Sequence, residues 1–185
     1  MFALRALALV LAASAALTAA ARGPATIFDL ADRIGKPAPA ITLSAGDGGA
    51  LTLGAADGKP TYVFLFAGWC GPCQESLPFV RSAFVRYGER VRFVGVDVLE
   101  DGDAARAAVA RAALPFAVAI YPIDQLDAIV APDVQLRSGM KYRIPADVLL
   151  DAKGVVRYVW HGLATNAEGE PYDLLPSYLA KLDIR

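Results

Sequence analysis

The chain has 185 residues, of which 56% are hydrophobic and 20% are charged, and its formal net charge is −1. A chain of this length and composition can bury a substantial core, which excludes intrinsic disorder. Its charges are scattered along the sequence, which argues against nucleic acid or an anionic membrane surface as the main partner.

The first 21 residues have the layout of a secretory signal peptide. Arg5 lies in a short positive region, an uncharged apolar run extends from Ala6 to Leu17, and small residues follow at 18–21. The apolar run is shorter than the about 20 residues that cross a bilayer, so cleavage is favoured over retention as an N-terminal anchor. Either outcome places the folded part in the periplasm or another extracytoplasmic compartment.

Residues 22–34 are expected to connect this leader to one domain at 35–185, which begins where glycine and prolines cluster at 35–39. The hydrophobic pattern predicts, in chain order, a hairpin of strands 41–43 and 51–53, a strand at 61–67, a helix at 74–87, a strand at 91–96, a helix at 101–113, a strand at 116–120, a short helix at 122–130, strands at 146–150 and 155–160, and a helix at 171–182. Alternating strands and helices followed by a hairpin indicate an α/β domain with a central mixed sheet.

The motif Trp69-Cys70-Gly71-Pro72-Cys73 lies between a predicted buried strand and a predicted helix. Unpaired backbone amides and the helix dipole at that position favour an anionic sulfur, so the pKa of the Cys70 thiol is expected to fall. Cys73 lies one turn further on and can attack a mixed disulfide formed by Cys70. Gly71 and Pro72 shape the turn, and proline fits the first turn of a helix. This pattern predicts redox chemistry carried by the two sulfurs, with no cofactor.

Two other interpretations of the cysteines are weaker. A bridge between Cys70 and Cys73 closes a very short loop and contributes little as a structural staple. A zinc site needs two further ligands, and His161 is the only other histidine or cysteine in the chain. No metal site is therefore predicted.

Several motifs that are separated along the chain are informative in combination. They are Gly35-Lys-Pro-Ala-Pro39, Gly58-Lys-Pro60 before the strand and the cysteine motif, Pro78 eight residues after Cys70, and Tyr142-Arg-Ile-Pro145 followed by a hairpin at 146–154. With them, segment 35–164 resembles the TlpA/ResA/CcmG group of thioredoxin-like proteins. The resemblance implies a thioredoxin-like fold with an N-terminal β-hairpin extension. It also implies a cis Ile144–Pro145 bond that faces the sulfurs and exposes the Ile144 backbone to an extended client segment.

The chain departs from that group at two positions. Phe64 stands where a polar residue usually precedes the first cysteine by six positions, and Ser76 stands where a glutamate often follows the second cysteine by three. A carboxylate there normally helps to move protons off the second thiol. Glu75 is a possible substitute, although one step along a helix rotates a side chain by about 100°.

The remaining conspicuous residues have structural interpretations. Trp69 is expected to form part of the docking surface. His161 is expected at the surface or in a hydrogen bond, and three aromatic residues are expected to pack against neighbouring side chains: Tyr121, Tyr158 and Trp160. The acids Glu100, Asp101 and Asp103 are expected to form a solvated loop and helix start.

The sequence thus predicts an extracytoplasmic thiol–disulfide oxidoreductase that reduces disulfides in client proteins. The resemblance implies apocytochrome c or a copper-site assembly protein as client, and a membrane thiol donor that restores the dithiol. An oxidase or isomerase of the same fold remains an alternative, as does a copper-binding metallochaperone. A peroxidase fits the motif poorly.

Overall fold

The computed structural model describes residues 34–122 and 144–184, apart from positions 39, 47, 55, 101 and 171. The elements are β1 (Ile41–Ala45), β2 (Ala50–Leu53), β3 (Thr61–Phe66), α1 (Gly71–Tyr87), β4 (Arg92–Glu100), α2 (Gly102–Ala112), β5 (Val118–Pro122), β6 (Ala146–Leu150), β7 (Val156–His161) and α4 (Leu175–Lys181). The predicted signal peptide and nearly all of the connecting segment lie outside the described residues. The short helix predicted at 122–130 also lies outside them, except for Pro122, which ends β5.

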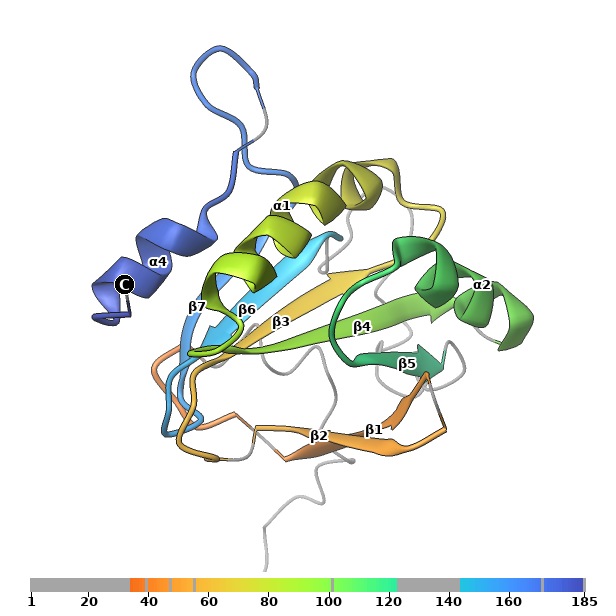
Figure 1. Cartoon of the computed structure of the whole chain (residues 1–185), viewed down its shortest axis with the longest axis horizontal. Helices are drawn as coiled ribbons and strands as arrows, with labels where there is room; N and C mark the ends of the chain where they lie inside the picture. The colour runs from red at the N-terminus through yellow and green to blue at the C-terminus, as the bar shows by residue number, and fades with distance from the viewer. Residues whose placement is uncertain are drawn as a thin grey trace, which may run out of the picture.

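The seven strands form one mixed sheet in the order β2-β1-β5-β4-β3-β6-β7 (Figure 1). Strand β3 is parallel to β4 and β4 is parallel to β5, whereas the other neighbours are antiparallel. The β1–β2 hairpin is the predicted N-terminal extension, and it joins the sheet through β1 and β5. The mixed α/β architecture expected from the sequence is confirmed.

Strand β3 is buried along its whole length because it lies between β4 and β6, with a core on each face. Successive side chains of a strand point to opposite faces. Val63 and Leu65 accordingly belong to one core, whereas Tyr62, Phe64 and Phe66 belong to the other. This alternation explains why the segment reads as a continuous apolar run.

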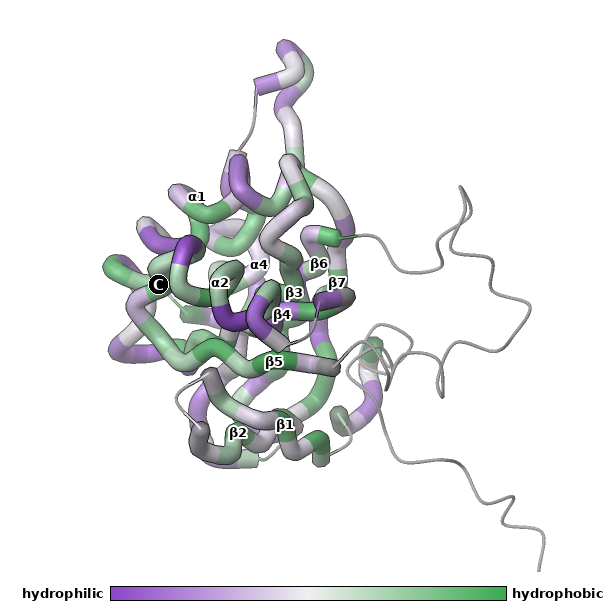
Figure 2. Tube along the Cα trace, turned by 90° about the vertical axis from the view of Figure 1, so that its right-hand side faces the viewer, coloured by the Kyte–Doolittle hydropathy of each residue, from purple (hydrophilic) through white to green (hydrophobic). Residues whose placement is uncertain are grey.

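Helices α1 and α4 cover the face of the sheet that carries Phe64. Leu77 and Val80 of α1 are buried in that core, together with Leu175 and Leu179 of α4. Hydrophobic and hydrophilic residues both occur along α1 (Figure 2), and the buried ones lie on one face, as expected of a helix with one side in the core. We call the buried cluster that contains these four residues together with Tyr62, Phe64, Phe66, Cys70 and Cys73 the helix-side core.

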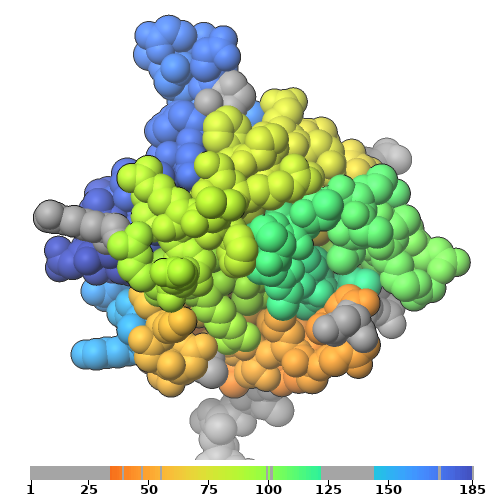
Figure 3. All heavy atoms as spheres, viewed as in Figure 1, coloured from red at the N-terminus to blue at the C-terminus, as the bar shows by residue number. Residues whose placement is uncertain are grey.

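The segment that starts the domain is tied to the turn before β7. The amide of Gly35 donates to the carbonyl of Val156 across 2.7 Å, and the amide of Ala38 donates to Gly154 across 2.8 Å. These bonds bring 34–38 against the sheet and make it part of the folded domain. Between β7 and α4 the chain projects from the body of the molecule (Figures 1 and 3).

Three predicted boundaries differ from the structure by three residues or more. Helix α1 begins at Gly71 rather than at 74, because Cys70 is its N-cap and Pro72 is accommodated in the first turn. Strand β4 extends to Glu100 rather than ending at 96, because its pairing with β5 continues to that residue. Helix α4 begins at Leu175 rather than at 171. At this start the Leu175 amide donates a hydrogen bond to the Asp173 side chain across 2.9 Å.

Among the described residues, every helix is too short or too polar to cross a membrane.

Candidate active site

Cys70 and Cys73 are joined by a disulfide at the N-terminus of α1, with their Cα atoms 5.2 Å apart. Cys70 is the N-cap residue, and its sulfur accepts a hydrogen bond from the Cys73 amide across 3.2 Å. The amides and the dipole of the helix therefore act on the Cys70 sulfur, as the sequence predicts. In the dithiol form the same groups favour a thiolate on Cys70.

The two cysteines differ from their neighbour Trp69 in exposure. Cys70 is 5% exposed and Cys73 is fully buried at 0%, whereas Trp69 is 60% exposed. Trp69 is one of four large hydrophobic residues that stand out at the described surface. An exposed indole beside a redox sulfur can provide apolar contact area for a docking protein.

The Ile144–Pro145 peptide bond is cis, which confirms the prediction. The carbonyl oxygen of Ile144 lies 3.7 Å from Cys70 Sγ, so this segment faces the redox pair. Ile144 packs against both cores, and β6 begins directly after Pro145. The structure therefore brings together the two cysteines and the Ile144–Pro145 pair that the sequence analysis singled out.

Glu75 does not reach the interior of the site. Its side chain is exposed, whereas Ser76, one position later, is buried and donates a hydrogen bond to the Pro72 carbonyl across 3.0 Å. Phe64 is fully buried and stacks on Phe66 with ring centroids 5.4 Å apart. None of these positions supplies a buried carboxylate beside Cys73.

The interpretation of Glu100 as part of a solvated loop is wrong. Glu100 is the last residue of β4, and its carboxylate accepts a hydrogen bond from the amide of Gly68, two residues before Cys70. Strand pairing carries β4 further than predicted and brings Glu100 under the active-site loop. Asp103 does lie at the exposed start of α2, where it pairs with Arg106; Asp101 lies outside the described residues.

Sequence reasoning missed a buried acid next to Glu100. Asp97 is fully buried in β4, and neither carboxylate oxygen accepts a hydrogen bond from a donor in the described part of the chain. Burial, followed by the neighbouring Glu100 carboxylate, raises the pKa of Asp97 to about 8, and Arg111 opposes the shift. Two neighbouring carboxyl groups disfavour each other's ionisation, so Asp97 is the one of the two that retains its proton near neutral pH.

A second missed acid, Asp147, lies in β6 two residues after Pro145. It is 6% exposed and accepts a hydrogen bond from the hydroxyl of Tyr62. Burial raises the pKa of Asp147 to about 7; the Tyr62 hydrogen bond opposes this shift, and the charge of Asp173 adds to it. The available sequence signal was an aspartate inside the apolar run Ala-Asp-Val-Leu-Leu, where a charge without a partner would be costly.

The other predicted packing residues lie as expected. Tyr121 is buried, and Tyr158 and Trp160 each stack on Tyr178, with ring centroids 4.4 and 4.9 Å apart. His161 ends β7 at the exposed surface. The part of the chain that the structure describes contains no group of three or more histidine, cysteine or acidic side chains placed to hold a metal.

A sheet of this topology, with a Cys-x-x-Cys disulfide at a helix N-terminus facing a cis-proline segment, defines the thioredoxin-like class of proteins. The Redoxin family matches residues 33–170 of the chain. The chain belongs to that family, within its thiol–disulfide oxidoreductases of the ResA and DsbE type.

The relatives and solved structures agree with this assignment. The chain is 30% identical over 140 residues to thiol–disulfide oxidoreductase ResA of Bacillus thuringiensis subsp. konkukian, covering 75% of this chain and 76% of the relative. It is 27% identical over 148 residues to thiol:disulfide interchange protein DsbE of Yersinia pestis, covering 78% and 72% of the two chains. Other ResA proteins match over a shorter stretch, and there the chain spans about half of the relative, 51% of its length.

Two solved structures share the fold. The thioredoxin domain of a thiol–disulfide oxidoreductase from Bacteroides vulgatus superposes with a TM-score of 0.62 at 18% identity, covering 82% of this chain and 98% of that one. A secreted disulfide oxidoreductase of Mycobacterium tuberculosis, homologous to DsbE of E. coli, gives a TM-score of 0.54 at 21% identity, covering 76% and 95%. At these identities the likeness concerns the fold.

Proposed function

We propose that this chain is an extracytoplasmic thiol–disulfide oxidoreductase that reduces disulfides in client proteins through Cys70 and Cys73. The observation that carries the proposal is the position of the Cys70 sulfur. It caps α1, accepts a hydrogen bond from the Cys73 amide, and lies 3.7 Å from the Ile144 carbonyl oxygen. The sulfur is thus next to both its resolving partner and a backbone edge that a client segment can use.

The reaction has two exchange steps. The Cys70 thiolate attacks one sulfur of the client disulfide, which breaks the client S–S bond and leaves a mixed disulfide. Cys73 then attacks Cys70, which forms the Cys70–Cys73 bond and releases the second client sulfur as a thiol. Two electrons pass from the protein dithiol to the client, and a thiol donor at the membrane restores the dithiol.

Client docking is assigned to the surface around the sulfurs. Trp69 supplies apolar area, and Gly71 and Pro72 are exposed next to Cys70. The Ile144 backbone beside Pro145 can pair with an extended client segment. The apolar leader at 6–17 supports an extracytoplasmic location, and one structural relative is described as secreted. Apocytochrome c and copper-site assembly proteins are the client classes that the family resemblance favours.

The decisive experiment traps the mixed disulfide with a Cys73→Ser variant of the full chain. The variant should capture a client covalently on Cys70 in envelope extracts, and mass spectrometry should identify the adduct. Cys70→Ser and the double variant are the matched controls and should capture nothing. Recovery of no Cys70 adduct under these conditions would contradict the proposal, and the measured reduction potential of the pair would show whether it reduces or oxidises its clients.

A further inference from the structure

The resolving step requires a proton acceptor that the predicted residues do not supply. Cys73 is fully buried, so its thiol cannot lose a proton directly to bulk water. Glu75 is exposed on α1, and the inward-facing residue at the next position is Ser76, whose hydroxyl is bonded to the Pro72 carbonyl. The acceptor must therefore come from the sheet beneath α1.

Strand register places two acids on the helix-covered face of the sheet: Asp97 of β4, which is paired with Phe66 and interacts with Glu100 and Arg111, and Asp147 of β6. Asp147 is the one that follows the segment facing Cys70. Asp147 of β6 is paired directly with Phe64 of β3, and partners in an antiparallel pair have Cβ atoms about 5 Å apart on the same face. Phe64 and Cys73 both belong to the helix-side core. Tyr62, whose hydroxyl bonds to Asp147, belongs to the same core, which shows that the Asp147 carboxylate is on the side covered by α1.

The acid is also close to the redox pair along the chain. Asp147 lies two positions after Pro145, a path of about 7 Å along a strand. The Ile144 carbonyl before that proline lies 3.7 Å from Cys70 Sγ. Phe64 is a phenylalanine with no polar atom to offer, so Asp147 is the carboxylate that β3 and β6 present to this part of the core.

On this geometry, and given the proposed function above, we propose that Asp147 accepts the proton of the Cys73 thiol when Cys73 resolves the mixed disulfide. The Cys73 S–H bond breaks and its proton passes to the Asp147 carboxylate. The Cys73 thiolate attacks Cys70 Sγ, the bond between Cys70 and the client sulfur breaks, and the client leaves as a thiolate. The proton on Asp147 is then released to that thiolate or to water, which regenerates the carboxylate.

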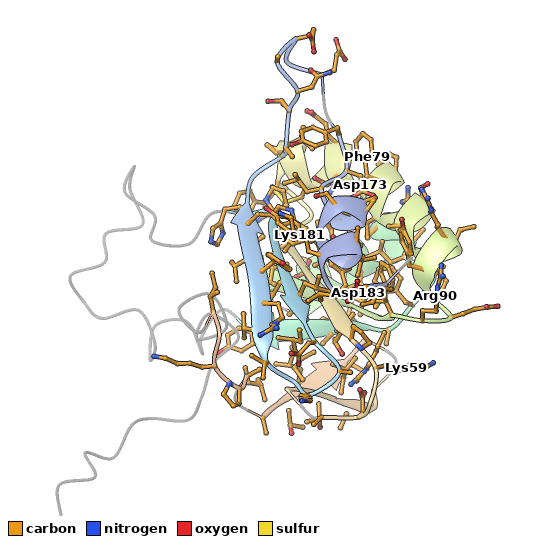
Figure 4. All side chains as sticks on the ribbon, turned by 90° about the vertical axis from the view of Figure 1, so that its left-hand side faces the viewer. Lys59, Phe79, Arg90, Asp173, Lys181 and Asp183 are labelled. Atoms are coloured by element: carbon orange, nitrogen blue, oxygen red, sulfur yellow. A yellow bond between two sulfur atoms is a disulfide. The ribbon has the colours of Figure 1, made fainter. Side chains whose placement is uncertain are left out.

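The surroundings of Asp147 suit this role. The Tyr62 hydroxyl of β3 donates a hydrogen bond to Asp147, and Trp160 of β7 is its cross-strand neighbour. The charge of Asp173, which lies two residues before α4 (Figure 4), also acts on it. From α1, the charge of Arg86 acts on Asp173. Burial is the main reason that the pKa of Asp147 is about 7, the range in which a carboxyl group can both take and return a proton at neutral pH.

The test starts from the reduced full chain and uses oxidised glutathione as the probe, which forms a mixed disulfide with Cys70. It measures, between pH 5 and 9, the rate at which Cys73 attacks this mixed disulfide and releases glutathione. Asp147→Asn keeps an oxygen for the Tyr62 hydroxyl, so the fold should be preserved. We expect Cys70 to attack glutathione at an unchanged rate, resolution at pH 7 to slow about tenfold to a hundredfold, and the inflection of the wild-type profile near pH 7 to disappear.

Two further variants separate proton transfer from a structural effect. Tyr62→Phe removes the hydrogen bond that lowers the pKa of Asp147, so the inflection should move to higher pH. Asp173→Asn removes a charge that raises the pKa of Asp147, so the inflection should move to lower pH. A merely structural role for Asp147 would not shift the profile in opposite directions.

Asp97→Asn is the matched control, because it removes the other acid that is buried in the described part of this sheet. It should leave the inflection in place. An unchanged profile in Asp147→Asn, or loss of the inflection in Asp97→Asn instead, would overturn the inference. Failure of Cys70 to attack glutathione in the wild-type chain would contradict the proposed function itself, so the two failures are distinguishable.

Discussion

The amide of Cys73 donates a hydrogen bond to the sulfur of Cys70 across 3.2 Å, within the first turn of α1. The two cysteines are therefore not equivalent. The amide and the helix dipole act on the Cys70 sulfur, whereas Cys73 lies inside the helix and in the core. This asymmetry supports the proposed roles, with Cys70 as the attacking and Cys73 as the resolving cysteine.

The first prediction concerns the acidity of Cys70. In the Cys73→Ser variant, which leaves the amide in place, the Cys70 thiol should titrate well below the ordinary thiol pKa of about 8.5. Alkylation rates with iodoacetamide between pH 4 and 10 measure this pKa. The same variant unfolded in guanidinium chloride is the control and should return to the ordinary value. A folded-state pKa at or above 8.5 would refute the assignment of the attacking role.

The second prediction concerns the close packing of Gly68. A Cβ atom at this position would lie 2.6 Å from Ala108 Cβ and 3.2 Å from Glu100 Oε2, so α2 and the end of β4 leave no room for it. Gly68→Ala should lower the free energy of unfolding by about 1–3 kcal/mol, measured by urea denaturation. Gly71→Ala is the control, because a Cβ there has nothing within 4 Å, and it should cost much less. Equal stability of the two variants would contradict the packing argument.

Much of the fold and site could be predicted because local patterns carry them. The continuous apolar run of β3, followed at once by Trp69-Cys70-Gly71-Pro72-Cys73, was enough to place the sulfurs at a helix N-terminus. The contacts of the buried Asp147 and of the partly buried Glu100 could not be predicted in the same way. Asp147 bonds to Tyr62, 85 residues away, and Glu100 bonds to Gly68, 32 residues away. Such contacts depend on which strands are neighbours and in what register, which local periodicity does not specify.

The third prediction concerns the hydrogen bond between Glu100 and Gly68. Glu100→Ala leaves the half-buried Gly68 amide without its acceptor, which typically costs about 1–3 kcal/mol. We expect a lower free energy of unfolding, together with faster amide hydrogen exchange at Gly68. Glu89→Ala, which removes an exposed acid after α1, is the control and should change neither quantity. Unchanged exchange at Gly68 in Glu100→Ala would show that the bond does not hold the loop.

The fourth prediction concerns the pH dependence of stability, which Asp97 should control in part. Burial raises the pKa of Asp97 to about 8 in the folded state, whereas an exposed aspartate in the unfolded chain titrates near 4. Between these values the folded state binds a proton that the unfolded state does not, so the free energy of unfolding falls as the pH rises from about 4 to about 8. The contribution of this group is therefore greatest in acid and is lost towards alkaline pH.

Asp97→Asn removes that titration and keeps a neutral polar side chain of nearly the same size. The variant should be more stable than the wild type at pH 8 by about 1–2 kcal/mol, and its stability should fall less steeply between pH 5 and 8. Urea denaturation at several pH values measures both quantities. Asp57→Asn is the control, because Asp57 pairs with Arg92 at the surface and should leave the slope unchanged. If Asp97→Asn instead had the wild-type slope, the Asp97 carboxyl group would be ionised in the folded state at neutral pH, and burial would not be what raises its pKa.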